Sequence, residues 1–329
     1  MTKSATRETA DIASVVGRKN AIINGNFDIW QRATSQTASN YGSADRWRHN
    51  ISGSTQAVSR QAFTLGQTDV PNNPKYYSRT VVSSVAGAGS LVIMNQRIEG
   101  VGTFAGTTAT LSFWAKADAS KNIAIEFYQN FGTGGSPSTA VDEIGVTTVA
   151  LTTSWAKHTV SAAIPSINGK TLGTNGNDNL QVSIWLDAGS TYNARTNSLG
   201  QQSGTFEFSQ VQMEAGSVAT TFEPRSVGEE LALCQRYYQD SGVISYQVLA
   251  RFSAGAGRAL AWWTWNVPLR GAPTVTTNAT WDTTSGFAGV PTFGSATTRG
   301  CYLGAASSNA VANGIQYLNG GIIYASAEL

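Results

Sequence analysis

The chain has 329 residues, of which 41% are apolar and 10% aromatic, so it can bury a sizeable core and is not disordered. Charged residues make up only 13% and the net charge is +2, which excludes the basic surface of a nucleic-acid-binding protein. No apolar run approaches the roughly 20 residues of a membrane span, so we expect no membrane insertion.

Residues 1–20 stand apart as a short helix-forming segment. Ala10, Ile12, Ala13, Val15 and Val16 can form one apolar stripe, and Gly17 followed by two basic residues is typical of a helix end. A helix this short is marginal by itself. We interpret the segment as a peptide that docks onto a larger particle, with a frayed terminus as the alternative.

Residues 21–225 have the period-two pattern of β-strands. Apolar residues alternate with polar ones over residues 111–117, 123–128 and 180–187, so each segment is expected to be a strand with one buried face. Gly- and Asn-rich turns separate the strands, as at residues 132–137 and 173–179. Many short strands with such turns predict an all-β fold, and here a β-sandwich jelly roll.

Residues 226–240 are predicted to form a short linker helix. Ser226 with Glu229 three residues later is a capping box, and the helix is expected to run to about Tyr238. Residues 241–329 are again Gly- and Thr-rich, with strands expected near 243–253, 258–269, 272–280 and 315–326. This part is expected to be a second, smaller β-sandwich.

The residues that usually carry catalysis are sparse. The two histidines, His49 and His158, lie in no metal-binding or hydrolase pattern, and the acidic residues rarely cluster. Cys234 and Cys301 are too few for a disulfide framework, so we read both as reduced thiols of a protein assembled in a reducing cytosol. We therefore predict that the protein is not an enzyme.

Aromatic residues are the most informative group. Trp114, Tyr128 and Trp185 occupy the polar face of the three expected strands, and neighbouring strands would combine their rings into one platform. Rings beside hydrogen-bonding groups suit a sugar, although subunit contact or loop packing would use the same rings. The polar residues that accompany them are Ser112, Lys116, Glu126, Gln181, Ser183 and Asp187.

A second aromatic group occupies both faces of one expected strand. Trp262, Trp263 and Trp265 alternate sides within a few residues. A strand that is apolar on both faces is buried on both, which predicts one side in the domain core and the other against a neighbouring subunit. The low charge of the whole chain is consistent with a surface partly covered by further copies of itself.

Several motifs resemble bacteriophage tail-fibre and spike structural proteins that begin with a jelly roll similar to carbohydrate-binding modules. The similar segments run in order from the NAIINGNFDIWQR run of residues 20–32 to RGAPTV at residues 270–275. Between them lie LSFWAKA (111–117), SWAKHTV (154–160), VQMEAGSVAT (211–220), FEPRS (222–226) and LCQRYY (233–238).

This resemblance implies a virion location, homotrimers, contact with other virion proteins and attachment to host surface polysaccharide. It also implies a structural Ca²⁺ ion, for which the matching positions are Asn26 or Asp28 with Glu214. No other cofactor is expected.

Three functions remain open from the sequence: a fibre or spike that binds host glycans, a purely structural head fibre, capsid decoration or tail adaptor, and a polysaccharide depolymerase component. The aromatic platform favours the first, and the scarcity of clustered acids disfavours the third.

Overall fold

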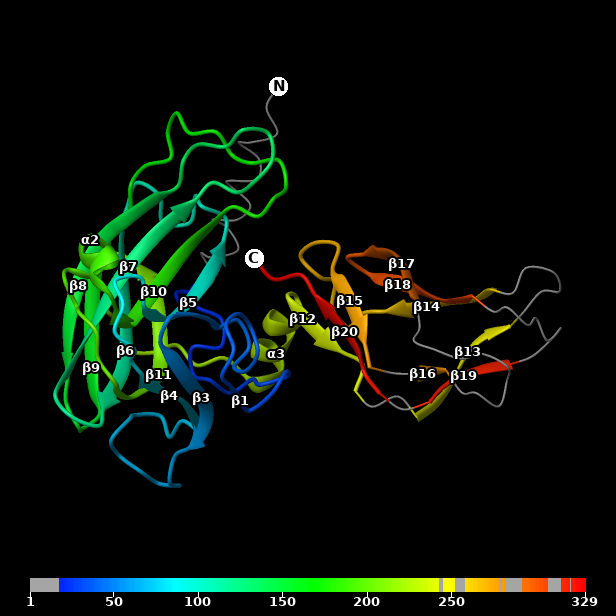
Figure 1. Ribbon diagram of the computed structural model, residues 1–329, viewed down its shortest axis with the longest axis horizontal. Helices are drawn as coiled ribbons and strands as arrows, with labels where there is room; N and C mark the ends of the chain where they lie inside the picture. The colour runs from blue at the N-terminus through cyan, green and yellow to red at the C-terminus, as the bar shows by residue number, and fades with distance from the viewer. Residues whose placement is uncertain are drawn as a thin grey trace. The chain divides into compact units, whose positions relative to one another are not determined.

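The computed structural model describes residues 18–242, 245–251, 258–278, 280–281, 292–306, 315–319 and 321–329. The chain divides into two compact units, the first ending at Glu230 and the second running from Leu231 to Glu328 (Figure 1). We call them the jelly-roll unit and the C-terminal unit. The expected docking peptide, residues 1–20, lies almost wholly outside the described residues, which begin at Arg18.

Two antiparallel sheets build the jelly-roll unit. The six-stranded sheet has the order β1 (Ser35–Gln36), β3 (Thr55–Ala62), β4 (Tyr76–Ser83), β11 (Gly204–Ala215), β6 (Thr108–Ala117) and β9 (Ala156–Ala163). The five-stranded sheet has the order β2 (Arg48–Ser52), β5 (Leu91–Glu99), β10 (Asn179–Ala188), β7 (Lys121–Asn130) and β8 (Val141–Leu151).

The order of the strands is that of a jelly roll. Strands β4, β5, β6 and β7 alternate between the two sheets, β8 pairs with β7, and β9, β10 and β11 alternate again. The late strands thereby insert between the early ones: β11 lies between β4 and β6, and β10 between β5 and β7. This connectivity confirms the expected jelly roll and all-β class.

The core lies between the two sheets and follows the alternation expected from the sequence. Leu111 and Phe113 of β6 are fully buried, as are Val182 and Ile184 of β10 and Phe127 of β7. Because one side of each strand packs inward, its alternate residues are left on the outer faces of the sandwich. The outer faces are therefore where side chains of the strands can meet a ligand.

The first and last segments of the jelly-roll unit are bound to each other. The Glu223 carboxylate accepts hydrogen bonds from the backbone N–H groups of Lys19 (2.9 Å) and Asn20 (3.0 Å). The buried Arg225 guanidinium donates to the carbonyl oxygens of Ile22 (2.9 Å) and Asn20. These contacts connect the motif that begins at Asn20 with the FEPRS motif of residues 222–226. The two motifs therefore hold the beginning and the end of the jelly-roll unit together.

Helix α3 (Val227–Gln235) confirms the short helix predicted after the jelly roll. The Glu229 N–H donates to the Ser226 hydroxyl oxygen (3.3 Å), as a capping box requires. The helix ends three residues earlier than expected, because Tyr238 begins strand β12 (Tyr238–Asp240) and pairs with β20. No helix among the described residues is long and apolar enough to cross a membrane.

After the end of α3, the described residues of the smaller C-terminal unit form three three-stranded sheets. Strands form near each of the four expected segments, whereas β12, β17 and β18 were not expected. The Gly-rich residues 292–306 lack a clear apolar alternation, which hid the last two. The sheets are β12 with β20 (Ile323–Ser326) and β15 (Thr274–Thr277); β13 (Ser245–Arg251) with β19 (Ile315–Asn319) and β16 (Thr280–Trp281); and β14 (Arg258–Thr264) with β18 (Gly300–Ala306) and β17 (Thr292–Thr297).

Candidate functional site

The three rings expected to form one platform do not share a sheet. Trp114 lies on β6 in the six-stranded sheet, whereas Tyr128 on β7 and Trp185 on β10 lie in the five-stranded sheet. A jelly roll places β6 and β7 in opposite sheets although they are consecutive in the chain. The single platform is therefore wrong, and its members belong to two separate outer faces.

On the five-stranded sheet, a buried ion pair connects Glu126 with Arg195. The Glu126 side chain is 0% exposed and accepts two hydrogen bonds from the Arg195 guanidinium, at 2.7 and 2.8 Å. The Trp185 indole N–H donates to the same carboxylate at 3.1 Å. The backbone N–H of Glu143 adds a further hydrogen bond at 3.1 Å. Every strong acceptor site of Glu126 is thereby used inside the protein.

A short helix covers this part of the sheet. Arg195 belongs to α2 (Asn193–Thr196), and its guanidinium carbon lies 5.1 Å from the Trp185 ring centre and 5.8 Å from that of Tyr128. Tyr192 packs against Trp185 with ring centres 5.2 Å apart. Burial alone would lower the pKa of Arg195, but hydrogen bonding to Glu126 raises it, so the guanidinium stays charged. Trp185 is 0% exposed and cannot stack on a sugar in this arrangement.

The other polar residues expected on this face also have internal partners. The buried Asp187 carboxylate accepts hydrogen bonds from the hydroxyls of Ser54 (2.6 Å) and Ser84 (2.9 Å) and from the Gln202 N–H (2.7 Å). Gln181 is half-buried and donates to the Ser183 hydroxyl at 2.8 Å. Of the six expected residues on this sheet, Tyr128 and Gln181 retain partial exposure.

A different aromatic group lies on the outer face of the six-stranded sheet. Phe63, Tyr77 and Trp155 contact one another, with ring centres 4.7 to 5.3 Å apart. All three are half-buried, as is Trp114. Trp114 pairs with Ser209 of β11, whose neighbour Phe208 pairs with Ser78, next to Tyr77. We call these four aromatic residues, together with Arg79 and Lys116, the aromatic face.

Two cations on the aromatic face share one carboxylate. Arg79, Glu207 and Lys116 are cross-strand neighbours on β4, β11 and β6. Glu207 accepts from Arg79 at 2.6 Å, and its second oxygen lies 3.1 Å from the Lys116 ammonium. Arg79 also donates to the Tyr77 hydroxyl at 3.2 Å, and the Lys116 ammonium lies 5.5 Å from the Trp155 ring centre. The Arg79 guanidinium carbon lies 5.9 Å from the Tyr77 ring centre, so each cation is held over an aromatic ring.

The sequence identified only part of this surface. Trp114 and Lys116 were expected to contact a ligand, and both lie on the aromatic face. Tyr77, Arg79 and Phe63 were missed because they come from the β3–β4 hairpin region, which lacks a clean aromatic–polar alternation. Trp155 was noted only as part of a motif. Half-exposed rings beside fixed cations can stack on the C–H faces of a sugar and donate hydrogen bonds to its hydroxyls.

The residues proposed to hold Ca²⁺ have partners within the protein. Both Glu214 oxygens accept hydrogen bonds, from the N–H and hydroxyl of Thr220 (2.8 Å each) and from the Gln212 amide (2.9 Å). Burial alone would raise the pKa of Glu214, but these hydrogen bonds outweigh it and lower the pKa. Asn26 donates to Asp28 at 2.8 Å. In the described part of the chain no three His, Cys, Asp or Glu side chains form a metal-binding group. The calcium site stays a prediction.

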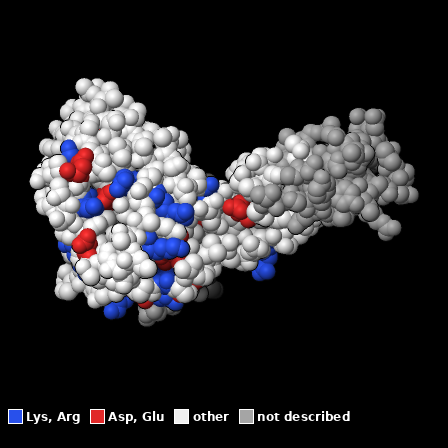
Figure 2. All heavy atoms as spheres, turned by 90° about the horizontal axis from the view of Figure 1, so that it is seen from below, with Lys and Arg blue, Asp and Glu red and all other residues white. Residues whose placement is uncertain are grey.

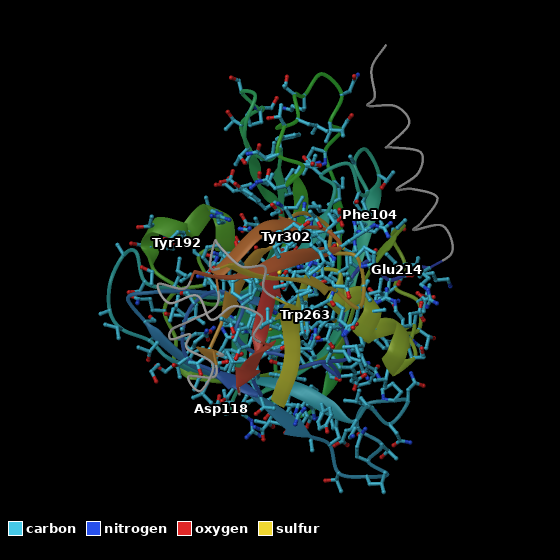
Figure 3. The ribbon with its side chains drawn as sticks, turned by 90° about the vertical axis from the view of Figure 1, so that its right-hand side faces the viewer. Phe104, Asp118, Tyr192, Glu214, Trp263 and Tyr302 are labelled. Carbon is cyan, nitrogen blue, oxygen red and sulfur yellow. The ribbon has the colours of Figure 1, made fainter. Side chains whose placement is uncertain are left out.

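The three tryptophans expected at a subunit interface lie in different environments. Trp262 is 43% exposed and packs edge-on against Tyr302, with ring centres 4.8 Å apart. Trp263 is half-buried on the same strand (Figure 3) and pairs with Cys301, so it lies on the opposite face of the strand from Trp262. Trp265 follows the end of β14, donates to the Thr297 carbonyl at 3.1 Å and packs against Leu269. The expectation of one strand is therefore wrong for Trp265, and the interface stays a prediction.

Comparison with known proteins gave matches among solved structures alone. No protein-family model and no curated protein matches the chain. A family 4 carbohydrate-binding module is 17% identical, covering 59% of this chain and 98% of its own, with a TM-score of 0.32. The family 11 module from Clostridium thermocellum is 9% identical, covering 56% and 98%, at 0.32. The enzymatically active domain of tailspike protein 4 of bacteriophage CBA120 is 10% identical over 60% of this chain, at 0.32, and the match spans 21% of that protein's chain. The jelly-roll assignment itself follows from the strand connectivity described above.

Proposed function

We propose that the protein is a non-enzymatic structural subunit of a bacteriophage virion, a fibre or spike component, whose jelly-roll unit binds glycans on the host surface. The observation that carries the binding proposal is the aromatic face. Its half-exposed rings lie beside two cations held in place by Glu207. The virion assignment rests on the motif resemblance, and the same motifs hold the ends of the jelly roll together.

The chemistry of the aromatic face favours binding over hydrolysis. A glycosidase uses two carboxyl groups roughly 5 to 10 Å apart across the scissile bond. Among the described residues that the strand register places beside the rings, Glu207 is the carboxylate, and it is paired with two cations. A depolymerase would need a second acid at this surface. We therefore place the depolymerase function last.

A purely structural role is the second candidate. Trp262 and Tyr302 form an exposed aromatic pair in the C-terminal unit, which suits contact with another protein chain. A head fibre, capsid decoration or tail adaptor would use such contacts without binding glycan. Under both functions we propose a homotrimer, and sedimentation of the purified protein should give about three times the mass of one chain. A monomer would contradict the trimer.

The glycan proposal is tested by binding of the full chain to a glycan array and to host polysaccharide. The Tyr77→Ala/Trp155→Ala variant should lose at least about tenfold in affinity, since each stacked ring contributes on the order of 1 kcal/mol. The matched control is Tyr128→Ala, which removes a half-buried ring from the other sheet and should bind like the wild type. Thermal unfolding checks that each variant is folded.

Each outcome of this test has a distinct meaning. Loss in the Tyr77→Ala/Trp155→Ala variant alone supports the aromatic face. Loss in Tyr128→Ala alone would move the site to the five-stranded sheet. No binding by the folded wild-type oligomer would contradict glycan recognition and favour the structural role.

A further inference from the structure

The charges on the aromatic face are unbalanced. Arg79, Lys116 and Lys157 carry positive charge, and Glu207 is the carboxylate that lies among them in the register. Lys157 is exposed and pairs with Trp114, so it extends the face toward its edge. Asp118, just after the end of β6, accepts a hydrogen bond from the Thr205 N–H at 3.0 Å, and with it the three cations still outnumber the two carboxylates. The surface around the rings therefore has an excess of positive charge.

Glu207 positions these cations but exposes little of its own charge. Its side chain is 5% exposed, against 35% for Arg79 and 30% for Lys116. Burial alone would lower the pKa of Arg79, whereas hydrogen bonding to Glu207 raises it, so the guanidinium remains charged. A guanidinium has five N–H donors and an ammonium has three, so both groups can bind a further acceptor while holding Glu207.

A buried hydroxyl among the rings also lacks a partner. Ser209 is 0% exposed and pairs with Trp114, and its Oγ makes no hydrogen bond with any described residue. Ser209 is the register partner of Trp114 on β6. On the other side of β11, its neighbour Phe208 pairs with Ser78, the residue after Tyr77. Buried polar groups are normally paired, but a hydroxyl with no exposed area cannot contact a ligand in this arrangement, so Ser209 is not part of the binding surface.

We propose that the aromatic face selects saccharides that bear carboxylate groups, with the sugar ring on Tyr77, Trp114 and Trp155 and the carboxylate at Arg79 and Lys116. This inference rests on the proposed glycan-binding function and names its substrate class. Arg79 keeps N–H donors beyond those it gives to Glu207 and Tyr77, and a hydrogen bond from a charged donor to a carboxylate is stronger than one to a neutral hydroxyl. Glu207 is a positioning residue, since it pairs with both cations and holds them beside the rings.

The test compares acidic and neutral forms of the same sugar. Binding of the full chain is measured on an array of uronate-bearing, sialate-bearing and neutral oligosaccharides, and then with oligogalacturonate and its methyl ester. The acid forms should bind at least about tenfold more tightly, because a charge-assisted hydrogen bond is stronger than a neutral one by roughly that factor. Raising the salt concentration should weaken the acid form and leave the ester unchanged.

A charge-balanced variant separates specificity from folding. Arg79→Gln/Lys116→Gln/Glu207→Gln removes the cations and their carboxylate together, so no charge is left buried and unpaired. It should bind acidic and neutral forms equally. The matched control is Lys170→Gln, which removes an exposed lysine 5.8 Å from the Phe131 ring in the loop before β10 and should keep the preference.

The outcomes distinguish this inference from the function on which it rests. Equal binding of acid and ester by the wild type, or an array on which the bound members are neutral, overturns the preference and leaves glycan binding standing. A preference that survives in the triple variant overturns the assignment to Arg79 and Lys116. If no saccharide of either class binds, both proposals are wrong.

Discussion

The two outer faces of the jelly-roll sandwich hold similar side chains, but their tryptophans are covered to different extents. Each has aromatic rings, a buried glutamate and an arginine bound to it: Trp185, Glu126 and Arg195 on the five-stranded sheet, and Trp155, Glu207 and Arg79 on the six-stranded sheet. On the first face a short helix covers Trp185 completely, and its arginine is 27% exposed. On the second the rings and the arginine remain half-exposed.

This difference arises from what the chain does after each sheet is formed. The segment between β10 and β11 folds back as α2 and places Arg195 over Trp185. The segment after β11 covers the six-stranded sheet only in part: Gly216 and Ser217 accept hydrogen bonds from Thr110 and Ser161, away from the rings. The same residue types therefore stabilise the fold on one side and remain available to a ligand on the other.

The sharpest way to break the comparison is to truncate one tryptophan on each face. Trp185→Ala removes a fully buried ring and should lower the free energy of unfolding by about 4 kcal/mol. Trp155→Ala removes a half-exposed ring and should cost about 1 kcal/mol. Urea denaturation of both variants measures the difference. Equal losses would show that the two faces are buried to the same extent.

The two arginines provide a second comparison. Arg195→Gln leaves Glu126 buried without its partner, which should cost about 3 kcal/mol of stability. Arg79→Gln leaves Glu207 still paired with Lys116 and should cost about 1 kcal/mol. The double variant Glu126→Gln/Arg195→Gln serves as the control and should recover part of the loss. If Arg79→Gln lowers the free energy of unfolding as much as Arg195→Gln does, the Arg79–Glu207 pair contributes to stability as a buried ion pair would.

Each sheet has one histidine, and the one in the five-stranded sheet is more deeply buried. We therefore expect that histidine to contribute more to the loss of stability in acid. Burial lowers the pKa of His49 on β2 to about 4, against an ordinary value near 6.5. As the pH falls below about 6.5, His49 becomes protonated in the unfolded chain but stays neutral in the folded protein. The free energy of unfolding therefore falls by about 3 kcal/mol by about pH 4.

His158 on β9 is the matched control for this effect. Burial lowers its pKa as well, but the side chain is half-buried and its share of the acid sensitivity should be smaller. The test compares the free energy of unfolding of the wild type, His49→Gln and His158→Gln at about pH 7 and about pH 4. Each substitution removes the proton uptake of one histidine. The expectation fails if His49→Gln is as acid-sensitive as the wild type.

The smallest expected effect concerns one serine on each face. Ser183 accepts a hydrogen bond from Gln181, so Ser183→Ala should cost about 1 kcal/mol. The Ser209 hydroxyl has no hydrogen-bond partner among the described residues. Ser209→Ala should therefore leave the free energy of unfolding unchanged or raise it by roughly a few tenths of a kcal/mol. The same Ser209→Ala variant should leave glycan binding unchanged, because the hydroxyl has no exposed area. A destabilised Ser209→Ala protein would show that its hydroxyl is satisfied within the fold.

The sequence by itself determined the class of fold and the inward side of its strands. Alternation of period two requires that Leu111 and Phe113 share one side and Trp114 and Lys116 the other, whatever the strands pair with. The capping box at Ser226 likewise fixed the start of α3, because the motif satisfies backbone donors within one turn. These are local properties, and the structure confirms both.

Only the tertiary structure decided which outward residues share a surface. Trp114 and Tyr128 are close in the chain but lie in different sheets, whereas Tyr77 and Trp155 are far apart in the chain and lie in contact. Glu126 is neutralised by Arg195, which no spacing in the sequence connects with it. Sheet order and loop cover depend on long-range pairing between strands, and the periodicity of a single strand carries no information about its neighbours.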